Sequence, residues 1–325
     1  MILEVFLIII GFFLLIKGAD YLVEGASKIA KKFYIPEIII GLTIVSMGTS
    51  MPELFVSTTS ALEGYSDIAI GNVLGSNICN LLLILGVSAI IRQIEFKKET
   101  RVIEIPAMLA ITVIFSIFCN SNKIVDRIEA SILIVMFIVF LCYTIWISVK
   151  EKNIKNSSIK ENSGQAENIN SMRNIVFVIL GIIALKFGGD LVVENVKKVA
   201  LLLNISEKII SVTIVALGTS LPELVTSVMA QVRGDSDIAV GNIIGSNIYN
   251  ILFIVGVSGA ITPISYSISY NFEIIILIIS TILLGIFPMI TPKGKMTKSN
   301  GFIYLFMYIL YMIIITHNGN IPINI

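Results

Sequence analysis

Two short segments of the sequence combine residue types that could hold a cation. Both read Gly-Thr-Ser-x-Pro-Glu-Leu, at residues 48–54 and 218–224. Each segment interrupts a long apolar run, where its proline removes a backbone N–H donor and frees the carbonyl four residues earlier. Freed carbonyls, hydroxyls and carboxylates are hard oxygen ligands. The pattern predicts two broken helices, each presenting oxygen atoms and one acid, Glu53 or Glu223.

These two acids would be costly in a bilayer without a counter-charge. A lone carboxylate at the bilayer centre costs at least ~2.5 kcal/mol, and two that face each other cost more. Open backbone in hydrocarbon is tolerated only where protein, water or an ion supplies partners. We therefore expect Glu53 and Glu223 to form one cation site. Four hydroxyls of the same motifs belong to the predicted set: Thr49, Ser50, Thr219 and Ser220.

A second motif follows each of the first pair. It reads Gly-Asn-x-x-Gly-Ser-Asn-Ile-x-Asn, at residues 71–80 and 241–250. Its small residues should let the third and eighth spans approach closely. Ser76 and Asn80 are four residues apart and share one helix face. Their equivalents in the second copy are Ser246 and Asn250. The combined set holds oxygen but no sulfur or imidazole, which suits Ca²⁺ and also Na⁺. For Asn72 and Asn242 two interpretations are equally good. Their side chains bind the ion, or they cap helices or form hydrogen bonds between helices.

The elements that carry these motifs belong in a membrane. The chain has 325 residues, of which 56% are hydrophobic and 14% charged, with a mean hydropathy of +0.93. Its apolar runs reach the ~20 residues that a helix needs to cross hydrocarbon. We predict an all-α polytopic membrane protein with ten transmembrane helices, of which the second and seventh are broken. The predicted spans are 2–31, 36–62, 67–91, 102–119, 125–148, 174–203, 207–231, 237–261, 272–291 and 301–316.

The two halves of the chain repeat each other. With an offset of 170, residues 36–81 match residues 206–251 at 25 of 46 positions without a gap. Each unit has five spans, an odd number, so the second unit must enter the membrane upside down relative to the first. Such inverted repeats place a shared site near the bilayer midplane. We expect a first repeat at 1–148, a hydrophilic linker at 149–173 and an inverted second repeat at 174–325.

The distribution of basic residues predicts an orientation. When loops are assigned alternately to two faces, sixteen Lys and Arg residues share the face of the linker and five lie on the other. By the positive-inside rule the linker is cytoplasmic and both termini are extracellular. The first 26 residues lack a basic start and a cleavage pattern, so we expect a retained first span. The expected location is the plasma membrane.

Other classes of function find little support in the sequence. The net charge of +1 is spread over short loops, so no nucleic-acid partner is indicated. Cys79, Cys119 and Cys142 lie in apolar runs and form no Cys-x-x-Cys pair, so neither a disulfide framework nor a thiolate metal site is expected. The single histidine, His317, follows the last apolar run. We therefore expect no enzyme and no covalent cofactor.

The paired motifs and ten spans resemble those of the calcium/cation antiporter superfamily, most closely its sodium/calcium exchanger branch, over essentially the whole chain. The resemblance implies an antiporter that exchanges Ca²⁺ for Na⁺ by alternating access, acts as a monomer in the bilayer, and moves helices one and six as the gate. It implies that Glu53 and Glu223 bind Ca²⁺ with the carbonyls of Thr49 and Thr219. It also implies a set of Na⁺ ligands, namely Ser50, Ser220, Ser76, Ser246, the backbone oxygens of Ser46 and Ala216, and the same glutamates, with Asn80 and Asn250 completing the centre.

One departure from the family pattern leaves the coupling ion open. Members of the branch often carry Asp at the position of Asn250, so this centre has two acids where others have three. Proton or K⁺ coupling is the alternative within transport, although the Gly-Asn-x-x-Glu pattern usual in the proton-coupled branch is missing. A cation channel is a further alternative, and an intramembrane hydrolase finds no Ser/His or paired-Asp set.

Overall fold

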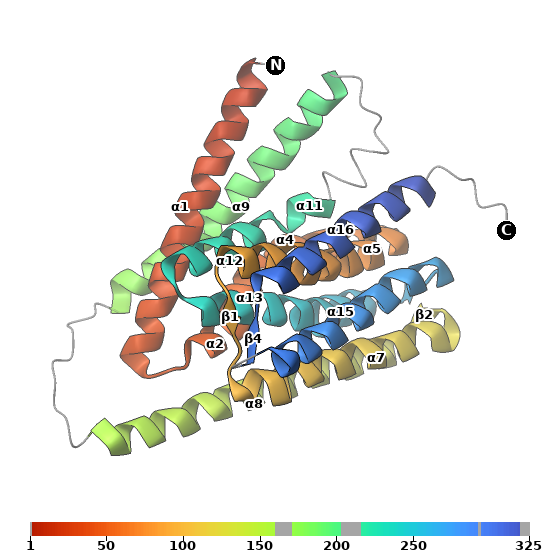
Figure 1. Cartoon of the computed structure of the whole chain (residues 1–325). Coiled ribbons are helices and arrows are strands. Elements are labelled where there is room, and N and C mark those ends of the chain that lie inside the picture. The colour runs from red at the N-terminus through yellow and green to blue at the C-terminus, as the bar shows by residue number, and fades with distance from the viewer. Residues whose placement is uncertain (1, 160–170, 203–215, 292–293, 319–325) are drawn as a thin grey trace.

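The computed structural model describes residues 2–159, 171–202, 216–291 and 294–318, and these are almost entirely helical (Figure 1). Within these residues, eight helices are long and apolar enough to cross a bilayer, and one bent helix pair makes a ninth. The seventh predicted span, 207–231, begins among residues that lie outside this description. A multi-pass helical membrane protein is therefore confirmed, while the count of ten stays a prediction.

The first half contains most of its predicted spans as interrupted helices. Its elements are α1 (Ile2–Phe33), α2 (Glu37–Ile40), η1 (Gly41–Val45), α3 (Ser46–Thr49), α4 (Met51–Leu62), α5 (Ser66–Ile78), η2 (Cys79–Ile84), α6 (Leu85–Ile91), β1 (Ile94–Glu95), η3 (Thr100–Glu104), α7 (Ile105–Asn122), β2 (Ile124–Val125) and α8 (Arg127–Ile159). The second predicted span is bent by 50° at Ser50, between α3 and α4. The predicted break is therefore confirmed in this half.

The second half follows the same order where the structure describes it. Its elements are α9 (Ser171–Leu202), α11 (Ala216–Thr219), α12 (Leu221–Arg233), α13 (Ser236–Tyr249), η5 (Asn250–Val255), α14 (Gly256–Ile261), β3 (Ile264–Ser265), η6 (Ile268–Tyr270), α15 (Asn271–Ile290), β4 (Lys295–Met296) and α16 (Lys298–Asn318). Glycines in the left-handed region follow both proline-started helices, at Gly64 with φ 84° and Gly234 with φ 88°. Only glycine adopts this conformation without steric cost, so both helices end at equivalent places.

Two π-helical segments interrupt equivalent spans at the asparagines of the second motif. η2 begins at Cys79, next to Asn80, and η5 begins at Asn250. A π-helical turn widens the helix locally and is frequent at functional sites. Both asparagines are 1% exposed, so the widened turns place their amides in the protein interior.

Glycines line the contact between α1 and α9, which lie side by side in antiparallel directions (Figure 1). A Cβ atom on Gly11 would lie 2.9 Å from the carbonyl oxygen of Gly188, and one on Gly18 would lie 2.9 Å from that of Gly181. Small residues let helix backbones approach closely in a membrane, where dispersion contacts hold helices together. In the repeat, Gly11 is equivalent to Gly181 and Gly18 to Gly188. Each glycine of α1 therefore contacts the α9 glycine that is equivalent to the other glycine of α1.

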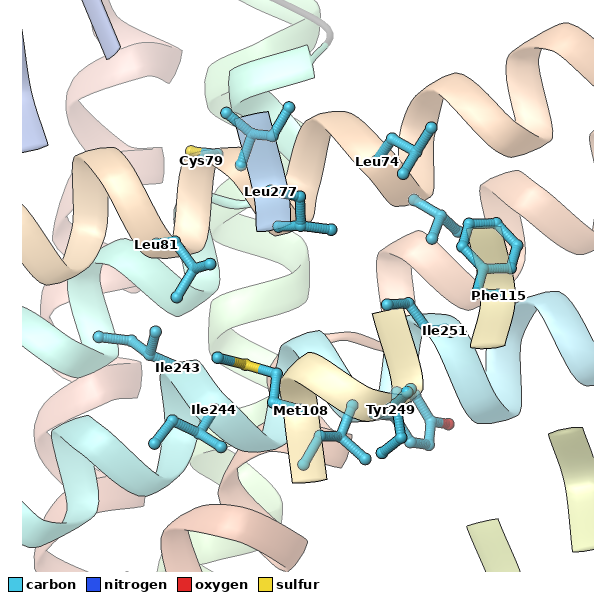
Figure 2. Packing of buried hydrophobic residues seen from close by; sticks show 14 of the residues in the cluster. Leu74, Cys79, Leu81, Met108, Phe115, Ile243, Ile244, Tyr249, Ile251 and Leu277 are labelled. Carbon is cyan, nitrogen blue, oxygen red and sulfur yellow. The ribbon is translucent and has the colours of Figure 1, made fainter. Parts of the chain in front are cut away.

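A hydrophobic core packs between α5, α7, α13 and α15, as Figure 2 shows. Leu74, Phe115, Ile251 and Leu277 are at most 1% exposed. They lie in α5, α7, η5 and α15, so this core packs the two halves of the chain against each other.

Short strand pairs connect loops at both ends of the bundle. β1 pairs with β4, and β2 pairs with β3, both antiparallel. The alternation of loops predicted from the sequence assigns β1 and β4 to the face of the linker, and β2 and β3 to the opposite face. The strand pairs therefore join loops that were assigned to the same face.

The expected packing of the eighth span needs correction, and α8 is longer than the span predicted for it. Gly241 and Gly245 do not face the third span: Cβ atoms there would lie 2.5 Å from the Ile38 carbonyl oxygen and 2.6 Å from Ser46 Oγ. The eighth span therefore approaches the first broken helix, whose backbone is uncovered where its turns widen. α8 continues to Ile159, well into the stretch expected as a linker.

Candidate cation site

The two proline motifs form matching turns between short helices. Ser50 separates α3 from α4 with φ −85° and ψ 11°, and Ser220 precedes α12 with φ −87° and ψ 5°. Pro52 and Pro222 lie in the first turn of the helix that follows, where a missing N–H costs nothing. The following glutamates occupy the same first turns, where the positive end of the helix dipole stabilises a carboxylate.

Glu223 is bound by hydroxyls of the opposite half. Ser50 donates from Oγ to Glu223 Oε1 at 2.8 Å, and the same Oγ lies 3.0 Å from Ser246 Oγ. Glu223 and Ser50 are each at most 1% exposed. The carboxylate of one repeat is therefore held by the broken turn of the other, as the shared site requires.

Glu53 has the equivalent environment with longer contacts. Ser76 donates to Glu53 Oε1 at 3.4 Å, and Ser220 from the opposite half donates to the same oxygen at 3.5 Å. Glu53 is 1% exposed. The structure thus brings together both predicted acids and four predicted serines, which are Ser50, Ser76, Ser220 and Ser246.

Asn72 fixes the geometry of the first broken helix and joins it to the second. Its Nδ2 donates to the Glu53 carbonyl oxygen at 3.3 Å and to Ser57 Oγ at 3.0 Å. Its Oδ1 accepts from Thr219 Oγ1 at 3.3 Å. The amide therefore supports the backbone of one acid and receives a hydroxyl from the other motif.

Asn242 repeats this arrangement with the halves exchanged. Its Nδ2 donates to the Glu223 carbonyl oxygen at 3.5 Å and to Ser227 Oγ at 3.0 Å, while its Oδ1 accepts from Thr49 Oγ1 at 3.1 Å. Hydrogen bonding between helices, one of the two interpretations left open for these asparagines, is therefore the one observed. The sequence interpretation missed Ser57 and Ser227, although their identity at equivalent repeat positions could have indicated them.

A third set of amides lies between the π-helical segments. Asn250 Nδ2 donates to Asn77 Oδ1 at 2.9 Å, and Asn77 Nδ2 donates to the Asn247 carbonyl oxygen at 3.3 Å. Asn77 is fully buried, and Asn247 is 1% exposed. Asn77 is thus a link between the halves, a role that its position off the Ser76 and Asn80 face did not predict.

Four oxygen atoms of the predicted ligands are buried without a hydrogen-bond donor among the described residues. They are Oε2 of Glu53, Oε2 of Glu223, Oδ1 of Asn80 and Oδ1 of Asn250. Leaving a buried polar atom unpaired costs roughly 1–3 kcal/mol, and more for a charged group. Two carboxylate and two amide oxygens form the donor set of a hard cation such as Ca²⁺ or Na⁺.

The site does not resemble a resident transition-metal centre. Among the residues that the structure describes, no three His, Cys, Asp or Glu side chains cluster in a way that could hold a metal ion. Cys79 and Cys119 are buried free thiols, and Cys142 is an exposed one. Two acids with neutral oxygens around them fit a cation that is bound and released.

The remaining predicted ligands differ in their availability. The Ser46 carbonyl already accepts a hydrogen bond from Ser50 N at 3.0 Å, and Thr49 Oγ1 lies 3.3 Å from it. The hydroxyls of Thr49 and Thr219 are occupied by the asparagines, which leaves their backbone oxygens as the expected ligands. Ala216 is the first residue of α11, beside residues that lie outside the described ones.

A cavity of about 260 Å³ lies beside the two proline turns, between α4 and α9. Its walls are formed by Pro52, Phe55, Val56, Lys186, Gly189, Asp190, Val193, Glu194, Gly218, Thr219 and Pro222. Asp190 and Glu194 are exposed. The cavity therefore connects the motif turns to the surface at one end of the bundle.

The family model described as sodium/calcium exchanger protein matches residues 3–146 and 173–317. The chain belongs to this family.

Relatives cover almost the whole of this exchanger-family chain. The sodium/calcium exchanger MaX1 of Methanosarcina acetivorans is 33% identical over 349 aligned residues, which cover 95% of the chain and 97% of the relative. The inner membrane protein YrbG of Escherichia coli is 35% identical over 291 residues, covering 87% of the chain and 89% of the relative. The putative antiporter CaxA of Alkalimonas amylolytica is 37% identical over 266 residues, covering 81% and 82%.

Solved structures of an exchanger share the fold. The sodium-calcium exchanger NCX_Mj soaked with Na⁺ and Ca²⁺ matches with a TM-score of 0.82 and 33% identity, covering 96% of this chain and 98% of that chain. The same exchanger soaked without Na⁺ and Ca²⁺ matches with a TM-score of 0.82 and 32% identity, covering 97% and 99%. The family makes the chain a calcium/cation antiporter, and the relatives MaX1 and CaxA are named as an exchanger and a putative antiporter.

Proposed function

We propose that this exchanger-family chain moves Ca²⁺ out of the cell in exchange for Na⁺, at one site formed by Glu53 and Glu223. The observation that carries the proposal is the reciprocal bonding of the two acids. Each acid accepts a hydroxyl from the opposite half and keeps one buried oxygen without a donor. Ca²⁺ or Na⁺ bound between them would supply the missing positive charge.

Competition for the two carboxylates supplies the coupling. An occupied site is nearly neutral, whereas the empty site would bury two like charges, which is strongly unfavourable in a low dielectric. Conformational switching is therefore favoured with an ion bound, and Ca²⁺ and Na⁺ replace each other on alternate crossings. Ser50, Ser220, Ser76, Ser246, Asn80 and Asn250 complete the ligand set in this proposal.

The proposed architecture is two inverted repeats of five spans each, with the linker in the cytoplasm and both termini outside. The offset of 170 between equivalent hydrogen bonds and the glycine crossing of α1 and α9 support this arrangement. We propose that α1 and α9 tilt together as the gate, because their contact is lined by glycines and lies outside the core of Figure 2. The proposed transport unit is the monomer in a plasma membrane.

A vesicle experiment tests the coupling ion. Purified protein is reconstituted into vesicles loaded with Na⁺, which are diluted into Na⁺-free buffer containing radiolabelled Ca²⁺. We expect uptake that needs the outward Na⁺ gradient and stops when a sodium ionophore dissipates it. Parallel vesicles loaded with K⁺, or carrying only a pH gradient, test the two other coupling ions. Uptake that ignores the Na⁺ gradient contradicts the proposal, and rapid passive equilibration of Ca²⁺ indicates a channel.

A further inference from the structure

Arg233 joins two elements that the gate would have to separate. It lies in the last turn of α12, and its Nε donates to Asp20 Oδ1 of α1 at 2.9 Å. Its Nη2 donates to the same Asp20 oxygen and to Glu24 Oε2 at 3.4 Å. Lys28, one turn further along α1, pairs with Glu24 at 2.5 Å. We call the group of Arg233, Asp20 and Glu24 the Arg233 bridge.

Other charged groups at this end do not replace the bridge. Arg92, at the end of α6, lies over Gly234, so a Cβ on this glycine would be 2.6 Å from Arg92 Nη1. Lys97 pairs with Asp237 at 2.5 Å, which joins the loop after α6 to α13. Neither of these contacts involves α1. Among the described ion pairs, those of Arg233 are the ones that join α1 to α12.

The repeat keeps the acids of this bridge but not the base. At the offset of 170, Asp20 and Glu24 correspond to Asp190 and Glu194 on α9, whereas Arg233 corresponds to Glu63 at the end of α4. Asp190 pairs with Lys186 on its own helix, at 3.3 Å. Glu63 is exposed and makes no ion pair with any residue that the structure describes. A bridge of this kind between α9 and α4 would bring acid against acid.

The residues next to these charged groups also differ in packing between the two ends of the bundle. Ala19 and Val23, on the α1 face beside the bridge, are completely buried. Their repeat equivalents Gly189 and Val193 line the cavity beside the motif turns. The α1 face beside Arg233 is therefore covered in this structure, whereas the equivalent α9 face lines a cavity.

We infer that Arg233 sets the side preference of the exchange cycle. Its bridge closes the end of the bundle predicted to be cytoplasmic, and it must break each time that end opens. Among the described residues no equivalent bridge holds the opposite end, so the resting protein opens preferentially on the Asp190 side. The inference rests on the proposed function in one respect, namely that the site opens to the two faces in turn.

The expected shift follows from the geometry of the bridge. Fully exposed ion pairs contribute little, but Arg233 and Asp20 are only 29% and 27% exposed, and the guanidinium donates through two nitrogens. We expect loss of the bridge to raise the population opened on the cytoplasmic side about 5- to 30-fold, which corresponds to about 1 to 2 kcal/mol at 1.4 kcal/mol per tenfold change.

Matched cysteines can report the two open states without any transport measurement. Val23→Cys and Val193→Cys occupy equivalent repeat positions, one at the closed end and one in the cavity. They are made in separate proteins that carry Cys142→Ser, because Cys142 is the exposed native thiol among the described residues. The rate of labelling by a hydrophilic maleimide then measures how often each end opens.

We expect Val193→Cys to label quickly and Val23→Cys slowly while Arg233 is present. Arg233→Ala should raise labelling at Val23→Cys about 5- to 30-fold without raising labelling at Val193→Cys. Glu63→Arg should slow labelling at Val193→Cys, because it supplies the missing base near Asp190. The control Lys97→Ala removes an ion pair on the same face that does not touch α1, and both labelling rates should stay as they were.

Two outcomes would overturn the inference. In one, Arg233→Ala leaves Val23→Cys as slow as before; in the other, both cysteines become faster together, which indicates a loosened fold instead of a shifted equilibrium. The labelling result is separable from the proposed function. A protein that shows the shift but no Na⁺-driven Ca²⁺ uptake refutes Ca²⁺/Na⁺ exchange, and a protein that takes up Ca²⁺ without the shift refutes the role of Arg233.

Discussion

Replacing Glu223 by glutamine should weaken Ca²⁺ binding more than Na⁺ binding. Glutamine keeps the shape and one oxygen but removes the charge. Glu223 is 1% exposed and accepts from Ser50 at 2.8 Å, so solvent screens its charge little. Removing one partner of a buried ion pair costs about 3–5 kcal/mol. At about 1.4 kcal/mol per tenfold change, Ca²⁺ affinity should fall about 100- to 4000-fold.

The loss for Na⁺ should be much smaller, because the Coulomb energy is proportional to the charge of the ion. About half the free energy, or roughly 1.5–2.5 kcal/mol, corresponds to a fall in Na⁺ affinity of about 10- to 60-fold. Calorimetric titration of purified wild-type and Glu223→Gln protein with each ion measures both ratios directly.

A second buried glutamate provides the control. Glu104, in η3, is 4% exposed and has one carboxylate oxygen without a donor, but it belongs to neither motif. Glu104→Gln should leave both affinities unchanged. If Glu223→Gln loses Ca²⁺ and Na⁺ by the same factor, or if the Glu104 variant behaves in the same way, the charge of Glu223 does not hold the ion and the reasoning fails.

Three further predictions concern the cation site, the packing of the eighth span and the pKa of Asp235. Asn250→Asp should raise Ca²⁺ affinity about 5- to 30-fold in calorimetry, since a charged acceptor is worth about 1 to 2 kcal/mol more than a neutral one. Gly241→Ala should lower the melting temperature in detergent, because its Cβ would lie 2.5 Å from the Ile38 carbonyl oxygen. Burial, followed by the charge of Glu37, raises the pKa of Asp235 above its ordinary value of 3.8. Asp235→Asn should therefore stabilise the protein at neutral pH and have no such effect below about pH 4.

Each of these predictions has its own contrary result. Unchanged or weaker Ca²⁺ binding in Asn250→Asp would show that this amide does not face the ion. Gly75→Ala is the packing control, because a Cβ there meets nothing within 4 Å, and equal melting temperatures for both glycine variants would contradict the assigned contact. For Asp235, the sign follows from a pKa that is higher in the folded state: the ionised form is the destabilised one, so the gain must grow as pH rises through 4. A gain that shrinks with rising pH contradicts it.

The sequence predicts that the two acids belong to one site because a repeated motif is hard to explain otherwise. Glu53 and Glu223 follow a proline in runs that must cross hydrocarbon, and only a shared counter-charge makes two such residues tolerable. The same offset also led to Ser50 and Ser220, and the structure places these serines on the opposite acid. The repeat could therefore predict which residues lie near each other in the fold.

The partners of individual side chains could not be predicted in the same way. The π-helical turns at Asn80 and Asn250 have no strong compositional signature, and they alter which face a residue occupies. Asn77, in α5 just before the first of these turns, links the two halves, although helical spacing removed it from the predicted face. Gly241 packs against the first broken helix and not the third span, because that choice depends on where backbone is uncovered.

The Arg233 bridge shows a second limit of sequence interpretation. Arg233 and Asp20 are 213 residues apart, and the repeat predicts no base at this position because its equivalent is Glu63. A difference between equivalent positions, such as Arg233 and Glu63, bears on which end of the bundle opens. Residues that are identical in the two halves indicate the shared site. The first kind becomes interpretable only when the two ends of the bundle can be compared in space.

The central claim is that Ca²⁺ and Na⁺ occupy the same place between Glu53 and Glu223. Anomalous diffraction from crystals soaked in Sr²⁺, as a heavier substitute for Ca²⁺, tests this most directly. We predict one strong peak within coordination distance of carboxylate oxygens from both glutamates, which disappears as Na⁺ in the soak is raised. A peak bound to other residues, or one that high Na⁺ leaves in place, would contradict exchange at a shared site.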